Sequence, residues 1–343
     1  MKIKTLLTFL IIASFLACSK KTTLTESVSD LIYVRNDGAD MPAHIYGNAA
    51  TKCFNIIVHG GPGDNGLSYR IGRYHSILEK EMAMVYWDQR GQGMAHGHYS
   101  QSGLNIPQMS EDLYYLVKSL KQKYGEDISI FIMGHSWGGT LGTAFMIDTS
   151  YQKEVKGWIE VDGAHDMPLL NKSAVEMFID IGESEIDKGN NKSTWKEIVT
   201  YAKSLDTSNI SLNESAELNY YSYVAEELIS EIKYEDYNSV SWFFSPMNPI
   251  NSAISGLNVN TLIEGESETI NYTPELHKIK VPCLFLWGKY DFNCPLPLGQ
   301  SAYEKVGTQK KELYVFQNSG HSPMDNEVDL FCDKVIGFVK QYK

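Results

Sequence analysis

Three side chains far apart in the sequence have the types and chain order needed for nucleophilic acyl transfer: Ser136, Asp291 and His321. A serine hydroxyl is a weak nucleophile at neutral pH, so it needs a histidine base and a carboxylate that orients the imidazole. Each of the three follows an apolar run that predicts a strand. We therefore expect all three on loops at the carboxyl end of one parallel sheet.

The serine lies in residues 134–138, Gly-His-Ser-Trp-Gly, between the apolar run 128–133 and the small-residue stretch 139–145. Strand, G-x-S-x-G and helix in this order predict a sharp turn that exposes the nucleophile. Glycines on both sides permit the tight turn, and the following helix N-terminus favours a developing negative charge. The alternative is a glycine-rich turn with an incidental serine.

The acid and the base follow two predicted strands in the last quarter of the chain, residues 281–288 and 312–316. Asp291 comes after the first strand, and His321 comes after the second, behind a glycine. The alternatives are a turn-capping Asp291 and a surface His321, since the chain has nine histidines. The order Ser, Asp, His favours the triad.

An oxyanion hole needs two backbone N–H groups aimed at one point. The residue after the nucleophile, Trp137, supplies one candidate donor. The second comes from the loop 59–63, His-Gly-Gly-Pro-Gly, after the predicted strand 54–58, with Gly61 as the first choice and Gly60 as the second. An ordinary strand-to-helix turn is the alternative for this loop.

Four segments together resemble the prolyl aminopeptidase (proline iminopeptidase) family of α/β-hydrolases: residues 59–63, 88–93 (Asp-Gln-Arg-Gly-Gln-Gly), 134–139 and 288–295. The resemblance covers residues 30–165 and 274–343. It implies oxyanion donors at Gly61 and Trp137, and it implies that the 88–91 turn braces the site. The chain departs from the family pattern at residues 94–98 and lacks a matching Trp-Glu pair in the lid.

The succession of apolar strand runs and amphipathic helices predicts an α/β fold. We expect a mostly parallel, eight-stranded sheet covered by helices on both faces. Residues 30–165 and 274–343 would form this core, which begins with strands at 31–35 and 42–46 and a helix near 68–80. Residues 166–273 are mostly helical and polar, and would form an inserted lid.

The lid holds 18 acidic residues and six lysines, a difference that equals the net charge of −12 of the whole chain. An acidic lid would attract a cationic substrate end such as a free α-amino group. The alternative is a solvated outer face. Three acids on a predicted helix are candidates for binding the substrate: Glu226, Glu227 and Glu231. The negative charge argues against nucleic-acid binding.

The N-terminus is typical of an export signal. Lys2 and Lys4 precede an apolar stretch that is too short to span a membrane, and a small residue then precedes Cys18. This resembles a bacterial lipoprotein signal over residues 1–18, with Cys18 acylated, followed by a flexible tether at 19–29. We expect a lipid-anchored protein of the bacterial cell envelope; a plain secretory signal is the alternative.

Neither a cofactor nor a metal site is predicted, because no two cysteines have zinc-ligand spacing. Export permits disulfides, and the sequence leaves the pairing state open for Cys53, Cys283, Cys294 and Cys332. It also leaves the oligomeric state open.

Three functions remain open. The first is an aminopeptidase that releases an N-terminal residue, proline among the candidates, from short peptides. The second is a carboxylesterase or acyl hydrolase on small esters. The third is a ligand-binding protein without activity on a hydrolase fold.

Overall fold

The computed structural model describes residues 24–234, 254, 257, 259, 263 and 266–343. The predicted signal 1–18, with its Cys18, and residues 19–23 of the predicted tether lie outside the described residues. In the described part of the chain, no helix combines the length and the apolar character that a membrane span requires.

A single sheet forms the centre of the molecule, with eight strands in the spatial order β1-β2-β4-β3-β6-β7-β8-β9. Strands β1 and β2 are antiparallel to their neighbours, and all pairs from β4 to β9 are parallel. The predicted α/β fold with a mostly parallel sheet is therefore confirmed. The strands are β1 (Val28–Asn36), β2 (Ala39–Gly47), β3 (Cys53–Val58), β4 (Ala83–Trp87), β6 (Ser129–His135), β7 (Gly157–Val161), β8 (Cys283–Gly288) and β9 (Lys311–Phe316).

The structure corrects the expected boundaries in three places. A ninth strand, β5 (His96–Gly97), pairs with β2 in a segment without a strand pattern. Strand β1 begins at Val28, inside the predicted tether 19–29, because its main chain pairs with β2 along its whole length. The helix expected near 68–80 is a short 3₁₀ helix, η2 (Gly66–Arg70), followed by α2 (Arg73–Glu81), and the two are separated at Gly72.

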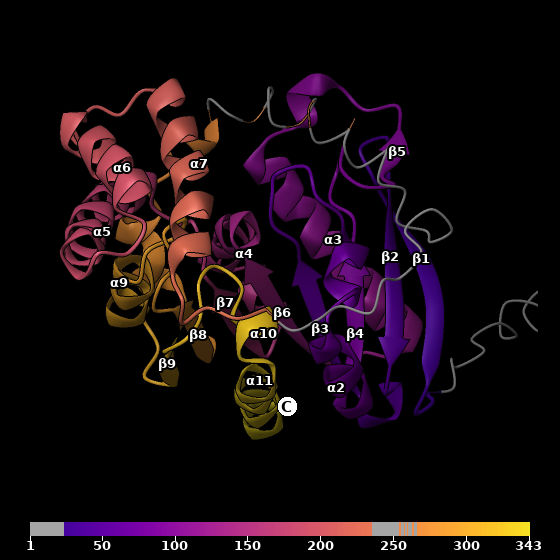
Figure 1. Ribbon diagram of the computed structural model, residues 1–343. Helices are drawn as coiled ribbons and strands as arrows, with labels where there is room; N and C mark the ends of the chain where they lie inside the picture. The colour runs from indigo at the N-terminus through magenta and orange to yellow at the C-terminus, as the bar shows by residue number, and fades with distance from the viewer. Residues whose placement is uncertain (1–23, 235–253, 255–256, 258, 260–262, 264–265) are drawn as a thin grey trace, which may run out of the picture.

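Helices cover both faces of the sheet (Figure 1). On one face, α2 and α11 (Val328–Tyr342) enclose a buried cluster with the strands. On the other face lie α3 (Ile106–Tyr124), α4 (Trp137–Ile147) and α9 (Pro297–Lys305). The short elements are η1 (Ala49–Thr51), η3 (Gln101–Gly103), η4 (Gln152–Glu154), η6 (Thr273–Lys278) and α10 (Pro323–Asn326).

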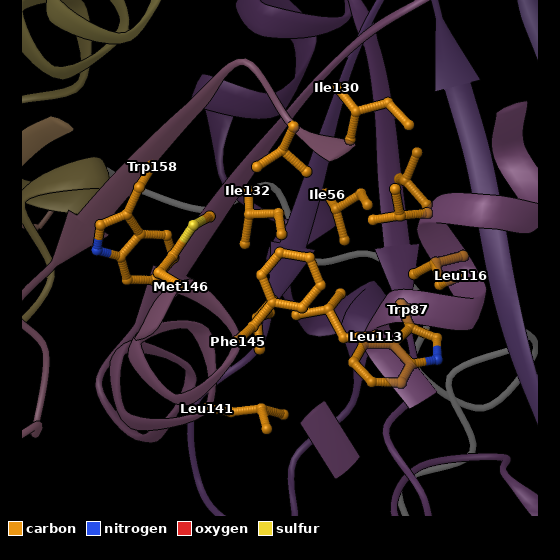
Figure 2. Close-up of a cluster of buried hydrophobic side chains, with 14 of the residues drawn as sticks. Ile56, Trp87, Leu113, Leu116, Ile130, Ile132, Leu141, Phe145, Met146 and Trp158 are labelled. Carbon is orange, nitrogen blue, oxygen red and sulfur yellow. The ribbon is translucent and has the colours of Figure 1, made fainter. Parts of the chain in front are cut away.

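The larger core lies between the central strands and helices α3 and α4. Figure 2 shows Ile56 and Ile132 of neighbouring strands facing Phe145 of α4 and Leu113 of α3, all fully buried. Each such side chain contributes about 1.5–3 kcal/mol relative to an exposed position. Helix α4, which follows the nucleophile, approaches the sheet closely because Gly142 has no side chain: a Cβ there would lie 2.1 Å from the Trp158 ring.

The insertion after β7 contains three described helices, α5 (Met167–Lys188), α6 (Lys192–Ser204) and α7 (Leu212–Leu228), which lie opposite the β1–β2 edge in Figure 1. They share a hydrophobic core of their own, which also includes Phe292 from the core domain. We call this insertion the cap. Its entry and exit are joined: Asp166 and Asn271 form an antiparallel bridge, and the Met167 N–H donates to the Ile270 carbonyl at 2.8 Å.

Candidate active site

Ser136 lies at the turn between β6 and α4, in a strained conformation. Its φ of 57° and ψ of −122° are unusual for a residue with a side chain. The turn is possible because Gly138 lacks a Cβ, which would lie 1.9 Å from the Val58 carbonyl oxygen. Trp137 begins α4, so its N–H belongs to the first helical turn, which has no partner within the helix.

Asp291 and His321 are brought together by the loops after β8 and β9. The Asp291 Oδ2 lies 3.0 Å from His321 Nδ1. The other carboxylate oxygen accepts the N–H groups of Asn293 and Cys294, both at 2.8 Å. Asp291 is fully buried and His321 is 8% exposed, so the carboxylate is fixed and the imidazole retains one route to the surface.

Burial alone would lower the pKa of His321, but the charge and hydrogen bond of Asp291 raise it above its ordinary value. Asp291 accepting at Nδ1 assigns the proton of the neutral ring to that nitrogen and leaves Nε2 free to act as a base. Ser136 and His321 line the same cavity. Catalytic hydrogen bonds in ligand-free structures are often long and tighten when substrate binds.

A second histidine connects the oxyanion loop to His321. The Gly60 N–H donates to the Tyr69 hydroxyl at 2.8 Å, and this hydroxyl lies 2.6 Å from His135 Nδ1. His135 Nε2 in turn lies 2.7 Å from the main-chain oxygen of His321. Burial, followed by the nearby imidazole of His321, lowers the pKa of His135 to about 3. His135 is therefore neutral, with its proton on Nε2.

This network separates the two candidate donors of the 59–63 loop. The Gly60 N–H, our second choice, is occupied by Tyr69. Gly61 and Trp137, by contrast, line the cavity beside Ser136. Gly61 has a φ of 116°, a conformation that favours glycine.

The 88–91 turn holds this arrangement from below. Gln89 donates to the His59 carbonyl at 2.9 Å and accepts from the Trp137 indole N–H at 2.9 Å, so one side chain joins the oxyanion loop to the nucleophile turn. The next residue, Arg90, makes two hydrogen bonds of 2.7 Å to the carboxylate of Asp112. Both of these charged side chains are fully buried.

The cavity in front of Ser136 has a volume of about 380 Å³. Its apolar wall includes Met167, Leu170 and Leu218 of the cap, and Phe292. Among the described residues, the one acidic side chain that lines it is Glu268, which accepts a 2.6 Å hydrogen bond from Ser215, and no lysine or arginine lines it. The described wall therefore favours a neutral or cationic ligand.

The predicted substrate-binding acids fall in different places. Glu227 and Glu231 are exposed, and the cavity wall includes neither, because they lie off the buried stripe of α7 formed by Leu218, Ser222 and Ala225. Glu226 is buried, and its carboxylate accepts the His321 main-chain N–H at 3.2 and 3.1 Å instead of lining the cavity. Sequence reasoning missed Glu268, which no motif marks.

Asp291, Cys294 and His321 place three potential metal-ligand atoms within 4.8 Å of one another. The carboxylate is already occupied by two main-chain N–H groups and the imidazole. Burial also raises the pKa of the Cys294 thiol, which keeps it protonated. These contacts account for the cluster as an acid–base pair beside a neutral thiol. The four described cysteines, Cys53, Cys283, Cys294 and Cys332, are all free and buried.

The comparisons with known proteins agree with this geometry. Residues 55–179 match the family described as serine aminopeptidase, S33. A probable aminopeptidase of Bacillus subtilis (strain 168), YbaC, is 22% identical over 297 residues, which cover 81% of this chain and 86% of the relative. A proline iminopeptidase of Saccharolobus solfataricus is 26% identical over 290 residues, covering 83% of this chain and 84% of the relative.

Similar folds are also found among esterases. An esterase from Exiguobacterium antarcticum superposes with a TM-score of 0.57 at 16% identity, covering 93% of this chain and 99% of the esterase. At this identity the likeness concerns the fold alone.

Proposed function

Because the chain is an α/β-hydrolase of the prolyl aminopeptidase family and a serine hydrolase, we propose that it is an aminopeptidase that releases an N-terminal residue from short peptides, proline among its candidate substrates. The observation that carries the proposal is the cavity beside Ser136, whose described wall holds one carboxylate, Glu268, and no cationic side chain. A free α-amino group is cationic at neutral pH and complements this wall.

We assign the chemistry as follows. His321 Nε2 accepts the proton of the Ser136 hydroxyl as its oxygen attacks the substrate carbonyl carbon. Asp291 holds the ring and stabilises the imidazolium that forms. The N–H groups of Gly61 and Trp137 bind the oxyanion. His321 then protonates the leaving amine, and water hydrolyses the acyl-enzyme by the same steps.

The cap supports a preference for short substrates. Its residues Met167, Leu170 and Leu218 form part of the cavity wall, so a substrate bound at Ser136 is in contact with the cap. An enclosed space of about 380 Å³ holds a few residues of a peptide. Long or folded chains are excluded from it.

A carboxylesterase is the second candidate, because the apolar part of the same wall would also accept an acyl chain, and an esterase shares the fold. The deciding experiment compares aminoacyl-arylamides, including the prolyl compound, with short acyl esters on the purified protein. Higher kcat/KM on the arylamides supports the aminopeptidase. Turnover of esters alone would refute it, and turnover of neither would favour the binding-protein alternative.

The proposal retains the exported, lipid-anchored location, which depends on the sequence of residues 1–18. Replacement of Cys18 by alanine should remove the lipid and release the protein from the membrane fraction. A variant that stays in that fraction would contradict the anchor.

A further inference from the structure

One face of cap helix α7 contacts the loop that carries Asp291. The Ser222 hydroxyl donates to the Phe292 carbonyl at 2.8 Å. One turn later, Glu226 accepts the Phe292 N–H at 3.4 Å and the Asn293 side-chain N–H at 3.2 Å. Ser222 and Glu226 are four residues apart and therefore share a face of the helix. Together they hold both polar groups of the residue that follows Asp291.

The same carboxylate also reaches the loop that carries the imidazole. Its two oxygens lie 3.2 and 3.1 Å from the main-chain nitrogen of His321. The approach requires glycine at the preceding position, because a Cβ on Gly320 would lie 2.3 Å from Glu226 Oε2. Glu226 therefore joins the acid loop, the histidine loop and the cap.

The contact is enclosed and charged. Glu226 is 4% exposed, and among the described residues no lysine or arginine pairs with it. Its negative charge lies beside the loop of the imidazole and adds to the effect of Asp291, because both charges raise the pKa of His321. A hydrogen bond to a buried carboxylate is stronger than one between neutral groups.

We propose that Glu226 is a positioning residue for His321, which makes the orientation of the imidazole depend on the docking of cap helix α7. The proposal rests on the triad assigned above. It differs from a role in binding the substrate amine, because the carboxylate is directed at main-chain N–H groups and does not line the cavity. When α7 is docked, the histidine loop is fixed; when α7 moves away, His321 loses the acceptor of its N–H.

Several titratable groups face or surround this carboxylate and would share any change in its charge. They are Asp291, His321, Asp162, Cys294, Tyr223 and Tyr234. A test based on pH must therefore compare variants with the wild type over the whole profile, not at a single pH.

The test uses Glu226→Gln, with Glu227→Gln on the exposed side of the same helix as the matched control. Three readouts are measured: turnover of an uncharged acyl ester, turnover of an aminoacyl-arylamide, and the rate of labelling by a fluorophosphonate. We expect Glu226→Gln to lower kcat about tenfold on both substrates with little change in KM, and to slow labelling by a similar factor, since supporting partners of active groups are typically worth ten- to a hundredfold.

The pH profile gives an independent readout. Without the negative charge of Glu226, the imidazolium is less stable, so the acidic limb of kcat/KM should move to lower pH in Glu226→Gln. A purely structural role would lower activity without moving this limb. Glu227→Gln should match the wild type in every assay.

Two results would overturn the proposal. Unchanged kcat and labelling in Glu226→Gln would show that the contact does not position His321. A rise in KM confined to the aminoacyl substrate would assign Glu226 to the substrate amine instead. The ester and the fluorophosphonate report on the triad whether or not peptides are the substrate, so a failure of the aminopeptidase assignment leaves this test intact.

Discussion

The Tyr69 hydroxyl and His135 Nδ1 lie 2.6 Å apart, and this contact joins the two sides of the site. Tyr69 accepts the Gly60 N–H, so its own proton is directed to His135. His135 then donates to the main chain of His321. A chain of three hydrogen bonds thus sets the distance between the oxyanion loop and the histidine loop behind Ser136.

Replacement of Ser136 by alanine should abolish turnover while preserving the fold, because no other hydroxyl occupies the strained turn. Loss of a catalytic serine lowers kcat roughly a millionfold in a related chemistry. The measurement is kcat on the best substrate together with fluorophosphonate labelling. Ser193→Ala, at an exposed position of α6, is the control. Turnover close to that of the wild type would remove Ser136 from the mechanism.

Replacement of Glu268 by glutamine should raise KM for aminoacyl-arylamides about tenfold and leave uncharged esters unaffected. The reason is that a hydrogen bond to a charged group contributes about 1.5–3 kcal/mol, and the amide retains shape but not charge. Steady-state kinetics on the two substrate classes measures the difference. The exposed Glu217 serves as the control in Glu217→Gln. An equal loss on both classes would argue against recognition of an amine.

Glu226 should make the folded state less stable as the pH rises from about 4.5 to about 7. Burial, followed by the charge of Asp291, raises its pKa from 4.5 to about 7. Over this window the folded state keeps a proton that the unfolded chain has released. Stability is therefore greatest below pH 4.5 for this group and declines by at most about 1.4 kcal/mol per pH unit.

Urea unfolding of the wild type and of Glu226→Gln across this range tests the linkage. The difference in unfolding free energy between the two proteins should vary with pH in that window and level off above it. A difference that stays constant from pH 4.5 to 8 would show that Glu226 titrates normally in the folded protein.

Replacement of Arg90 by methionine should destabilise the protein by about 3–5 kcal/mol, because it leaves the buried Asp112 carboxylate without its partner. Arg35→Met provides a contrast, since Arg35 pairs with Asp40 at the surface with its own side chain 78% exposed, and we expect no measurable change there. Denaturant unfolding measures both. Equal effects would mean that burial of the Arg90 pair contributes nothing.

The sequence was sufficient for the fold because its strands are continuous apolar runs separated by amphipathic helices, a pattern that one architecture explains. The loops of Ser136, Asp291 and His321 could be located for the same reason: each follows a buried strand. The break at Gly72 was not predicted, since a short 3₁₀ helix and an α-helix share their apolar spacing over a few residues.

Contacts between loops were beyond the reach of sequence patterns. Tyr69 and His135 are 66 residues apart, and only the folded sheet brings them together. On α7, a closer reading of the apolar stripe through Leu218 and Ala225 would have separated the buried Glu226 from the exposed Glu227. The partner of Glu226, a main-chain N–H near residue 321, carries no signal in the sequence at all.

The bridge between Asp166 and Asn271 makes the cap an exchangeable module. Since the chain leaves and re-enters the hydrolytic scaffold at adjacent points, evolution can lengthen, shorten or replace everything between them without disturbing the register of β7 and β8. Specificity can diverge in this way while the bond-breaking apparatus is inherited unchanged. Any new module must, however, bring its own acceptor for the His321 loop, which limits how freely such exchanges succeed.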